Sequence, residues 1–181
     1  MERYTTESGR MIDFEEIAPD IITNEFKEWL YRNGYFRVPA SVKYHGSHSG
    51  GLYEHSKEVY KILKEYGEKK IVKWDRPESP FVIGMLHDLC KMDQYIYNEE
   101  LERWEYDTLN KNNRWNNGHA EKSLALILGH LRLTQQEVMC IRWHMGAFDD
   151  KEHWKFFKSV EPDNAVMYTH TADMVAAQRG S

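Results

Sequence analysis

Four histidines and two aspartates each fall on a core-facing or entry position of a segment with helical periodicity. They are His55, His87, Asp88, His119, His144 and Asp173. Neutral imidazole and carboxylate are both metal ligands, and burying such groups is costly unless something compensates them. The set suits Mn, Fe, Co, Ni or Zn and is a poor one for Ca or Mg. We therefore expect a site for one or two divalent transition-metal ions.

The number of ligands makes two ions plausible and leaves open whether one or two are bound. Six ligands exceed one tetrahedral site, so a pair about 3.5–4 Å apart with a bridging carboxylate is plausible. Asp88 is the expected bridge, because it follows the most apolar run, Phe81 to Leu86. Taken singly, His87 and Asp88 could instead end a helix in solvent, and His55 could be a hydrogen-bonded core residue.

Further side chains are candidates for contact with a substrate. His45 and His48 lie in a glycine-rich loop over 35–51 that leads into the helix of His55, and Arg142 lies two residues before His144. Lys91, one helical turn beyond His87, is either a cation for a phosphate or a charge at a helix C-terminus. The aromatic residues Tyr97 and Trp104 either stack on a base or pack.

Helical periodicity supplies the elements that must position these residues. The expected helices are 23–33, 52–66, 79–91, 119–131, 134–146 and 163–178. Ser79 is the expected N-cap of the third helix and Pro80 its first residue, and the apolar run that follows predicts a helix in the middle of the core. Thr134 and Glu137 form a capping box. The apolar face of 119–131 is expected to consist of Leu124, Ile127, Leu128 and Leu131.

Other segments are expected to be strands, loops or lead-in. Residues 92–117 contain two stretches rich in aromatic and β-branched residues, which predict an inserted β-hairpin. Residues 1–20 are expected to be a partly ordered lead-in, and 147–160 a loop that covers the core with Trp154, Phe156 and Phe157. His170 is expected in the core or behind the ligands, and His130 and His153 on the surface.

Composition describes one domain of ordinary size. The 181 residues are 41% hydrophobic and 29% charged. No apolar run approaches the roughly 20 residues of a membrane span, and the N-terminus lacks a signal-peptide core, so a cytoplasmic location is expected. The net charge of −5 argues against a broad grip on long duplex nucleic acid. Cys90 and Cys140 are expected to be free buried thiols.

The order of these motifs resembles the HD superfamily of metal-dependent phosphohydrolases. The resemblance spans about residues 35–178 and is closest to the catalytic domain of 3′→5′ exoribonucleases and to solitary phage-type HD proteins. The matching stretches are Gly50–Ser56, Leu86–Lys91, Gly118–Ser123, Arg142–Gly146 and His170–Asp173. Two departures stand out: the exoribonucleases carry a separate nucleic-acid-binding module, and the insertion at 92–117 is longer than the minimal family core.

The resemblance implies a single all-α HD bundle and a metal-activated water that hydrolyses a nucleotide or short oligonucleotide. It also implies that His55, His87, Asp88 and Asp173 hold a first ion, and that His119 and His144 hold a second one. Asp88 and Lys91 are then the expected catalytic residues, and the expected partner is a small phosphorylated substrate. Two alternatives remain: a di-iron oxygenase on the same ligands, and a non-hydrolysing nucleotide-binding HD module.

Overall fold

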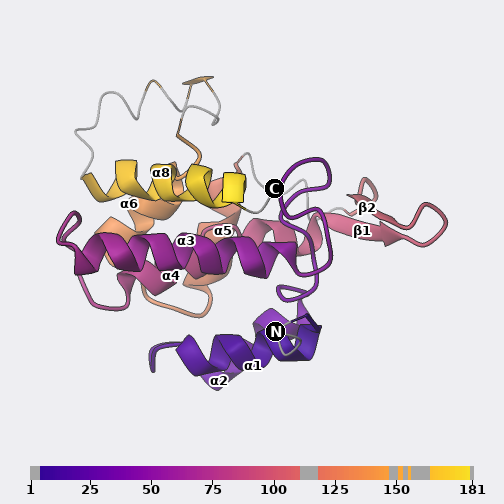
Figure 1. Cartoon of the computed structure of the whole chain (residues 1–181), viewed down its shortest axis with the longest axis horizontal. Coiled ribbons are helices and arrows are strands. Elements are labelled where there is room, and N and C mark those ends of the chain that lie inside the picture. Colours follow the sequence, from indigo (N-terminus) through magenta and orange to yellow (C-terminus); the bar gives the residue numbers. More distant parts are fainter. Residues whose placement is uncertain (1–4, 111–117, 147–150, 153–154, 156–163, 180–181) are drawn as a thin grey trace.

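The computed structural model describes residues 5–110, 118–146, 151–152, 155 and 164–179. Within these ranges the chain is mostly helical with one small antiparallel sheet, which confirms the expected all-α fold with an inserted hairpin (Figure 1). The elements in chain order are α1 (Glu7–Ile17), α2 (Asn24–Arg32), α3 (Gly51–Glu68), α4 (Ser79–Leu86), the 3₁₀ helix η2 (Leu89–Asp93), β1 (Tyr95–Asn98), β2 (Arg103–Tyr106), α5 (His119–Leu128), α6 (Gln135–Trp143) and α8 (Asn164–Arg179).

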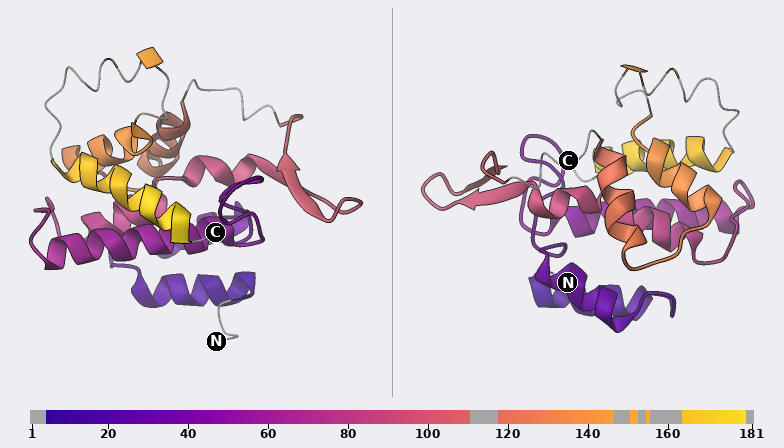
Figure 2. Two further views of the ribbon diagram at one scale, coloured as in Figure 1. Left: turned by 45° about the horizontal axis from the view of Figure 1, so that its top comes forward. Right: turned by 180° about the vertical axis from the view of Figure 1, so that it is seen from behind.

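Helix α4 lies in the middle of the core, as its sequence predicted. It contacts α3 and α6, and α8 packs against both of these helices. Helices α1 and α2 lie on the side of α3 that faces away from α8 (Figures 1 and 2). All residues of α4 are buried: Phe81 and Met85 belong to the core beside α1 and α2, whereas Ile83 belongs to the core between α3, α6 and α8.

The bounds of α4 differ from the prediction at both ends. Glu78 is the N-cap instead of Ser79, whose hydroxyl donates to Oε1 of Glu137 at 2.9 Å. The carboxylate of Glu137 is fully buried and needs hydrogen-bond donors. The Ser79 hydroxyl is one of these donors, so it is not available to cap α4. The helix ends at Leu86 because Asp88 leaves helical geometry, with φ −108° and ψ 20°, and η2 follows.

Helix α1 occupies Glu7–Ile17, where only a partly ordered lead-in was predicted for residues 1–20. The side chain of Thr6 caps α1, and Phe14 is fully buried in the core. Arg10 and Asp13 resemble solvated residues in the sequence, but each is only 5% exposed and forms an ion pair with a side chain of α3. These partners are distant in sequence, so local patterning could not reveal the helix.

Helix α3 covers the predicted segment and continues through Gly67 to Glu68, and it buries a face that includes His55. It begins directly after Gly50, whose φ of 85° is a left-handed conformation that suits glycine. A Cβ at Gly50 would also overlap the guanidinium of Arg10. The glycine-rich loop is therefore held closely between α1 and α3.

The C-terminal helices occupy the predicted segments with corrections, the first being that α6 ends at Trp143, three residues earlier than predicted. The capping box of Thr134 and Glu137 is present at the start of α6. Helix α5 ends at Leu128, three residues earlier than predicted, and the side chain of Leu128 is 58% exposed instead of facing the core. His130, predicted on the surface, is half-buried and stacks on Phe26 of α2, with ring centroids 4.6 Å apart.

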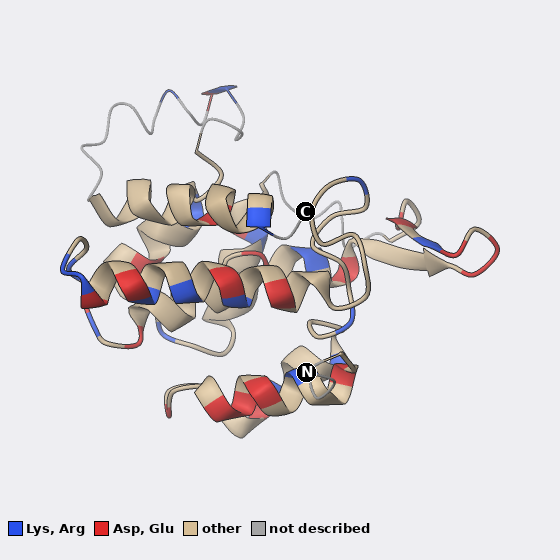
Figure 3. Ribbon diagram, viewed as in Figure 1, with Lys and Arg blue, Asp and Glu red and all other residues tan. Residues whose placement is uncertain are grey.

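The predicted hairpin is present and extends away from the bundle beyond η2 (Figure 2). Acidic residues gather at its tip, whereas acidic and basic residues alternate along the visible face of α3 (Figure 3). Both cysteines are buried, and neither forms a disulfide within the described part of the chain. Among the described helices, none is both long and apolar enough to cross a membrane. His153, Trp154, Phe156 and Phe157, for which a surface position or a covering role was predicted, lie outside the described residues.

Candidate metal centre

The six predicted ligands converge inside the bundle, with Asp88 in their midst. Oδ1 of Asp88 lies 2.7 Å from Nε2 of His119 and 3.5 Å from Nε2 of His144. Oδ2 lies 3.4 Å from Nε2 of His87 and 3.9 Å from Nε2 of His55. One buried carboxylate therefore faces four imidazoles from four different elements.

Asp173 of α8 supplies a second carboxylate. Its Oδ1 lies 2.9 Å from Nε2 of His55 and 3.6 Å from Nε2 of His87, so these two rings stand between Asp173 and Asp88. His119 and His144 approach the other oxygen of Asp88. The cluster thus divides into two groups that share one carboxylate.

Two of the imidazoles that face Asp88 lie at the C-terminal ends of helices. His87 and His144 are the C-cap residues of α4 and α6. Nδ1 of His87 lies 3.0 Å from the carbonyl oxygen of Gly84, and Nδ1 of His144 lies 2.7 Å from that of Ile141. A ring nitrogen that faces a carbonyl must be the N–H donor. In the neutral rings, Nε2 therefore carries the lone pair and points at the carboxylates.

Three inward-facing nitrogens make no well-formed hydrogen bond. They are Nε2 of His55, His87 and His144, and all three are buried. An unsatisfied buried polar atom costs about 1–3 kcal/mol, so three of them beside two carboxylates call for a shared cation. Imidazole nitrogen and carboxylate oxygen fit Mn, Fe, Co, Ni or Zn. The cluster could accordingly hold a metal ion.

The contacts also shift the pKa values of the cluster. Burial raises the pKa of Asp88, but Lys91 and His87 outweigh it and hold this pKa well below its usual value. Burial lowers the pKa of His87, yet Asp88 raises it to about 10. For His119, Cys90 and Asp88 likewise outweigh burial and raise the pKa to about 10. The carboxylates thus attract positive charge whether it comes from protons or from a metal.

Lys91 points at the centre from η2. Its largely buried Nζ lies 2.6 Å from Oδ2 of Asp88, and this pairing raises the pKa of Lys91 against the opposing effect of burial. Lys91 lines a cavity of about 380 Å³ together with His45, Tyr95 and His119. Lys91 is therefore a charge beside the ligands and not a solvated charge at a helix end.

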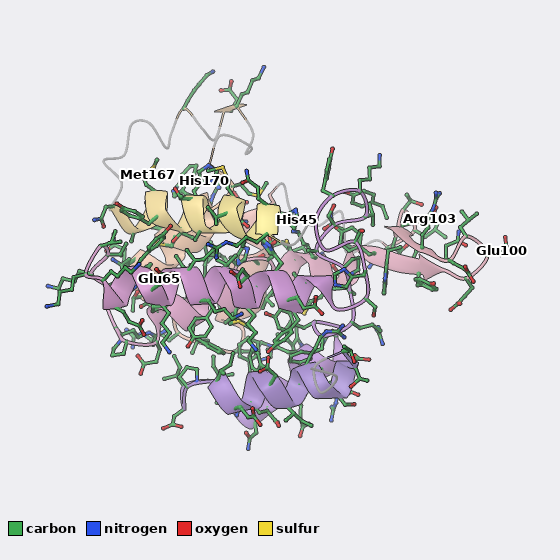
Figure 4. The ribbon with its side chains drawn as sticks, viewed as in Figure 1. His45, Glu65, Glu100, Arg103, Met167 and His170 are labelled. Atoms are coloured by element: carbon green, nitrogen blue, oxygen red, sulfur yellow. The ribbon has the colours of Figure 1, made fainter. Side chains whose placement is uncertain are left out.

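Two further histidines flank the ligands. The ring centroid of His45 lies 4.8 Å from that of His55, and burial together with His55 lowers the pKa of His45 to about 4, so its ring is neutral at pH 7. His170 lies on α8, and its Nδ1 is 2.7 Å from the carbonyl oxygen of His144, in keeping with a place behind the ligands. Figure 4 shows His170 on α8 and His45 beside the end of that helix.

Two predicted substrate contacts are engaged elsewhere. Nε2 of His48 lies 2.8 Å from Oε2 of Glu54. The guanidinium of Arg142 lies 2.6 Å from Oε1 of Glu121 and covers the ring of Trp143 at 4.2 Å. Neither His48 nor Arg142 lines the cavity that contains Asp88 and Lys91. His48 does border the cavity of Tyr97 and Trp104, and it shares a smaller cavity of about 310 Å³ with His45 and His55.

The hairpin presents its aromatic residues on one face. Tyr95 and Tyr97 alternate along β1 and pair with Tyr106 and Trp104 of β2. Tyr95 and Tyr106 line the cavity beside the ligands. Tyr97 and Trp104 line a neighbouring cavity of about 830 Å³, which Tyr95 also borders. Sequence patterns did not single out Tyr106, although its spacing of two from Trp104 was the available signal.

Sequence patterns also missed a contact of Cys90. Its Sγ lies 3.2 Å from Nδ1 of His119, and Asp88, Cys90 and His119 form one of the groups whose ligand atoms lie within 4.8 Å of one another. Its position two residues after Asp88 was the available signal, but a cysteine in an apolar stretch looks like ordinary core.

Comparison of the chain with models of protein families, with curated proteins and with solved structures gives no match. Its character therefore follows from its own residues and geometry. Within the described part of the chain, it is a helical protein with a small hairpin and a buried cluster of imidazoles and carboxylates that could hold a metal ion.

Proposed function

We propose that this chain is a metal-dependent phosphohydrolase or phosphodiesterase of the HD superfamily that acts on a nucleotide or short oligonucleotide. The observation that supports it most strongly is the position of Asp88, which faces His55, His87, His119 and His144 at once, with Lys91 beside it. The order of these residues along the chain is that of the HD pattern.

The two groups of ligands suggest which residues would hold which ion. His55, His87, Asp88 and Asp173 would hold the first, and His119 and His144, with Asp88 shared, would hold the second. Ions of this kind, when bound, acidify a water molecule toward hydroxide and neutralise phosphoryl oxygens. The imidazole tautomers fixed by the carbonyls of Gly84 and Ile141 would keep Nε2 available for this purpose.

The remaining residues of the cavity would bind and orient the phosphoester. Lys91 carries the cation best placed to contact a phosphoryl oxygen, and such a preorganised charge acts most strongly out of water. His45 is neutral at pH 7, lines the same cavity, and would donate a hydrogen bond to the leaving group. Tyr95 and Tyr106 form the wall of the cavity on the hairpin side.

The charges around the cavity favour a small substrate. The chain carries a net charge of −5, and many of its basic side chains are already paired with carboxylates. Few phosphates can therefore be neutralised beyond the one at the centre. We expect mononucleotides, dinucleotides or short single-stranded ends to be better substrates than long duplex nucleic acid.

The proposal is tested with purified protein and a panel of phosphoesters in the presence of added Mn. The intact chain should release phosphate or nucleotide, whereas Asp88→Asn should lose most bound metal and essentially all turnover. Asp75→Asn is the matched control, since Asp75 is exposed and remote from the cluster. Turnover that survives in a metal-free Asp88→Asn protein would remove the proposal.

The same ligands would also suit a di-iron oxygenase, because imidazole and carboxylate are good ligands for iron. Lys91 weighs against this reaction, since a cation beside the ligands serves a phosphate better than dioxygen. An iron-loaded protein that consumes oxygen with a substrate, and hydrolyses no phosphoester with any divalent metal, would establish the oxygenase instead.

A further inference from the structure

The imidazoles of the cluster differ in the group that contacts Nδ1, the ring nitrogen that points away from the carboxylates. His87 and His144 close a helix, so the carbonyl three residues earlier accepts from Nδ1 in each case. His119 instead opens α5, and the preceding residue, Gly118, is extended with φ −157° and ψ 142°. Because α5 begins at His119, this helix itself offers no carbonyl three residues earlier.

The sulfur of Cys90 occupies the place of that carbonyl. Sγ lies 3.2 Å from Nδ1 of His119, on the side of the ring away from Nε2, which faces Asp88. Cys90 is 3% exposed, and its backbone N–H donates to Oγ of Ser123 at 3.1 Å. Because Ser123 lies one turn along α5 from His119, the same helix that carries the imidazole also fixes the thiol.

We propose that Cys90 is a positioning residue of the metal centre, with its sulfur accepting the Nδ1–H of His119 so that Nε2 presents its lone pair to an ion beside Asp88. Without this acceptor, the ring is free to carry its proton on Nε2 and donate it to Asp88. In that tautomer Nε2 carries a proton and has no lone pair to offer an ion. The inference rests on the metal centre of the proposed function, but not on the reaction catalysed there.

Direct ligation by the sulfur is the competing role. Asp88, Cys90 and His119 are close enough to share an ion. However, Sγ and the carboxylate lie at opposite nitrogens of the imidazole, so an ion bound to Nε2 has the ring between itself and the sulfur. The geometry therefore favours a sulfur that supports the ligand over one that joins it.

Titration with Co²⁺ separates these roles without any substrate. The variants are Cys90→Ala, the larger Cys90→Val and Cys90→Ser, which retains an acceptor. Cys140→Ala is the control, because Cys140 is a second buried thiol that belongs to the hydrophobic core between α3, α6 and α8. Loss of a partner that orients a metal-bound histidine typically weakens metal binding about 10–100-fold. We expect that loss for one of two ions in Cys90→Ala and Cys90→Val, substantial recovery in Cys90→Ser, and no change in Cys140→Ala.

Four results would overturn the inference: wild-type affinity in both Cys90→Ala and Cys90→Val, an equal loss in Cys90→Ser, a single bound ion that does not involve His119, or a sulfur-to-cobalt charge-transfer band in the intact protein. The last would make Cys90 a ligand. Thermal unfolding of each variant identifies misfolding, and Cys90→Val replaces Cys90→Ala if the smaller residue prevents folding. A protein that binds two ions as expected but hydrolyses no phosphoester would remove the proposed function and leave this inference intact.

Discussion

The imidazoles around Asp88 fall into two kinds by their proton affinity. His87 and His119 have pKa values raised to about 10, because the neighbouring acidic groups outweigh burial. Burial dominates for His144 and for His45, whose pKa values are lowered, that of His45 to about 4. The metal-free centre therefore holds charged and neutral rings within contact distance of each other.

These shifts predict a stability maximum near pH 6.5 for the metal-free protein. Above 6.5, the ordinary histidine pKa, folded His87 and His119 retain protons that the unfolded chain loses, so the free energy of unfolding declines as the pH rises toward about 10. Below 6.5, the unfolded chain protonates His45 and His144 before the folded protein does, so stability declines on that side too. Urea unfolding of the chelated protein between pH 5 and 9 measures this, and a monotonic rise across the range would contradict it.

The six ligands could be found from sequence because each is a polar residue on an apolar helical face or at its entry. The partners of their outer atoms could not be found in the same way. The contact of Cys90 with His119 joins a 3₁₀ helix to the start of a distant helix, and a cysteine in an apolar stretch looks like packing. Lys91 was ambiguous because its direction depends on where α4 ends, which local propensity placed too late.

Helices α3 and α4 approach each other at Gly84. A Cβ there would lie 2.4 Å from Cα of Tyr60, so an alanine must push the two helices apart. We expect Gly84→Ala to lower the free energy of unfolding by about 1–3 kcal/mol. It should also weaken metal binding, because His55 and His87 lie on these helices. Calorimetry and metal titration check both effects.

Gly129→Ala is the matched control for this experiment. Gly129 has ordinary backbone geometry, and a Cβ there would approach its nearest neighbour no closer than 3.4 Å. Its stability and metal affinity should stay near those of the intact chain. If Gly84→Ala behaved in the same way, close approach of α3 and α4 would not set the positions of His55 and His87.

The hairpin is expected to select the substrate. Tyr97→Ala should raise KM for base-containing phosphoesters about tenfold and leave a minimal aryl phosphate nearly unaffected, because stacking on one base is worth about 1–3 kcal/mol. Trp104→Ala is less clean, since Trp104 also packs against the core. Leu101→Ala, at the exposed turn of the hairpin, is the control. Equal losses on both substrates would show that Tyr97 is structural.

At the scale of elements, local chemistry was sufficient wherever the signal lay within a few residues. The capping box of Thr134 and Glu137 gave the start of α6, and the aromatic stretches gave the hairpin. Helix α1 was missed because its polar residues, Arg10 and Asp13, are buried by partners far away in the sequence, among them side chains of α3. Interactions of this kind are decided by the tertiary fold and leave no periodic pattern.

For the molecule as a whole, a bound ion should contribute directly to the free energy of unfolding. An ion present at 100 times its Kd adds about 2.7 kcal/mol, which corresponds to an increase in Tm of about 5–10 °C for a chain of this size. Chelation followed by addition of Mn or Zn should remove and restore this increase. Asp88→Asn should show little response to either step, and a Tm of the intact chain that ignores the chelator would contradict a metal centre.

The ligands are drawn from widely separated parts of the chain. His55 lies on α3, whereas Asp173 lies on α8, the last described helix. During synthesis, a chain that has not yet produced α8 carries the four imidazoles and Asp88 but lacks the carboxylate on the far side of His55 and His87. The entropy of closing this long loop must be met before an ion finds its full set of ligands. Tight metal binding would therefore distinguish chains in which α8 has folded against the other helices. The metal content of a preparation would then measure the fraction of such chains.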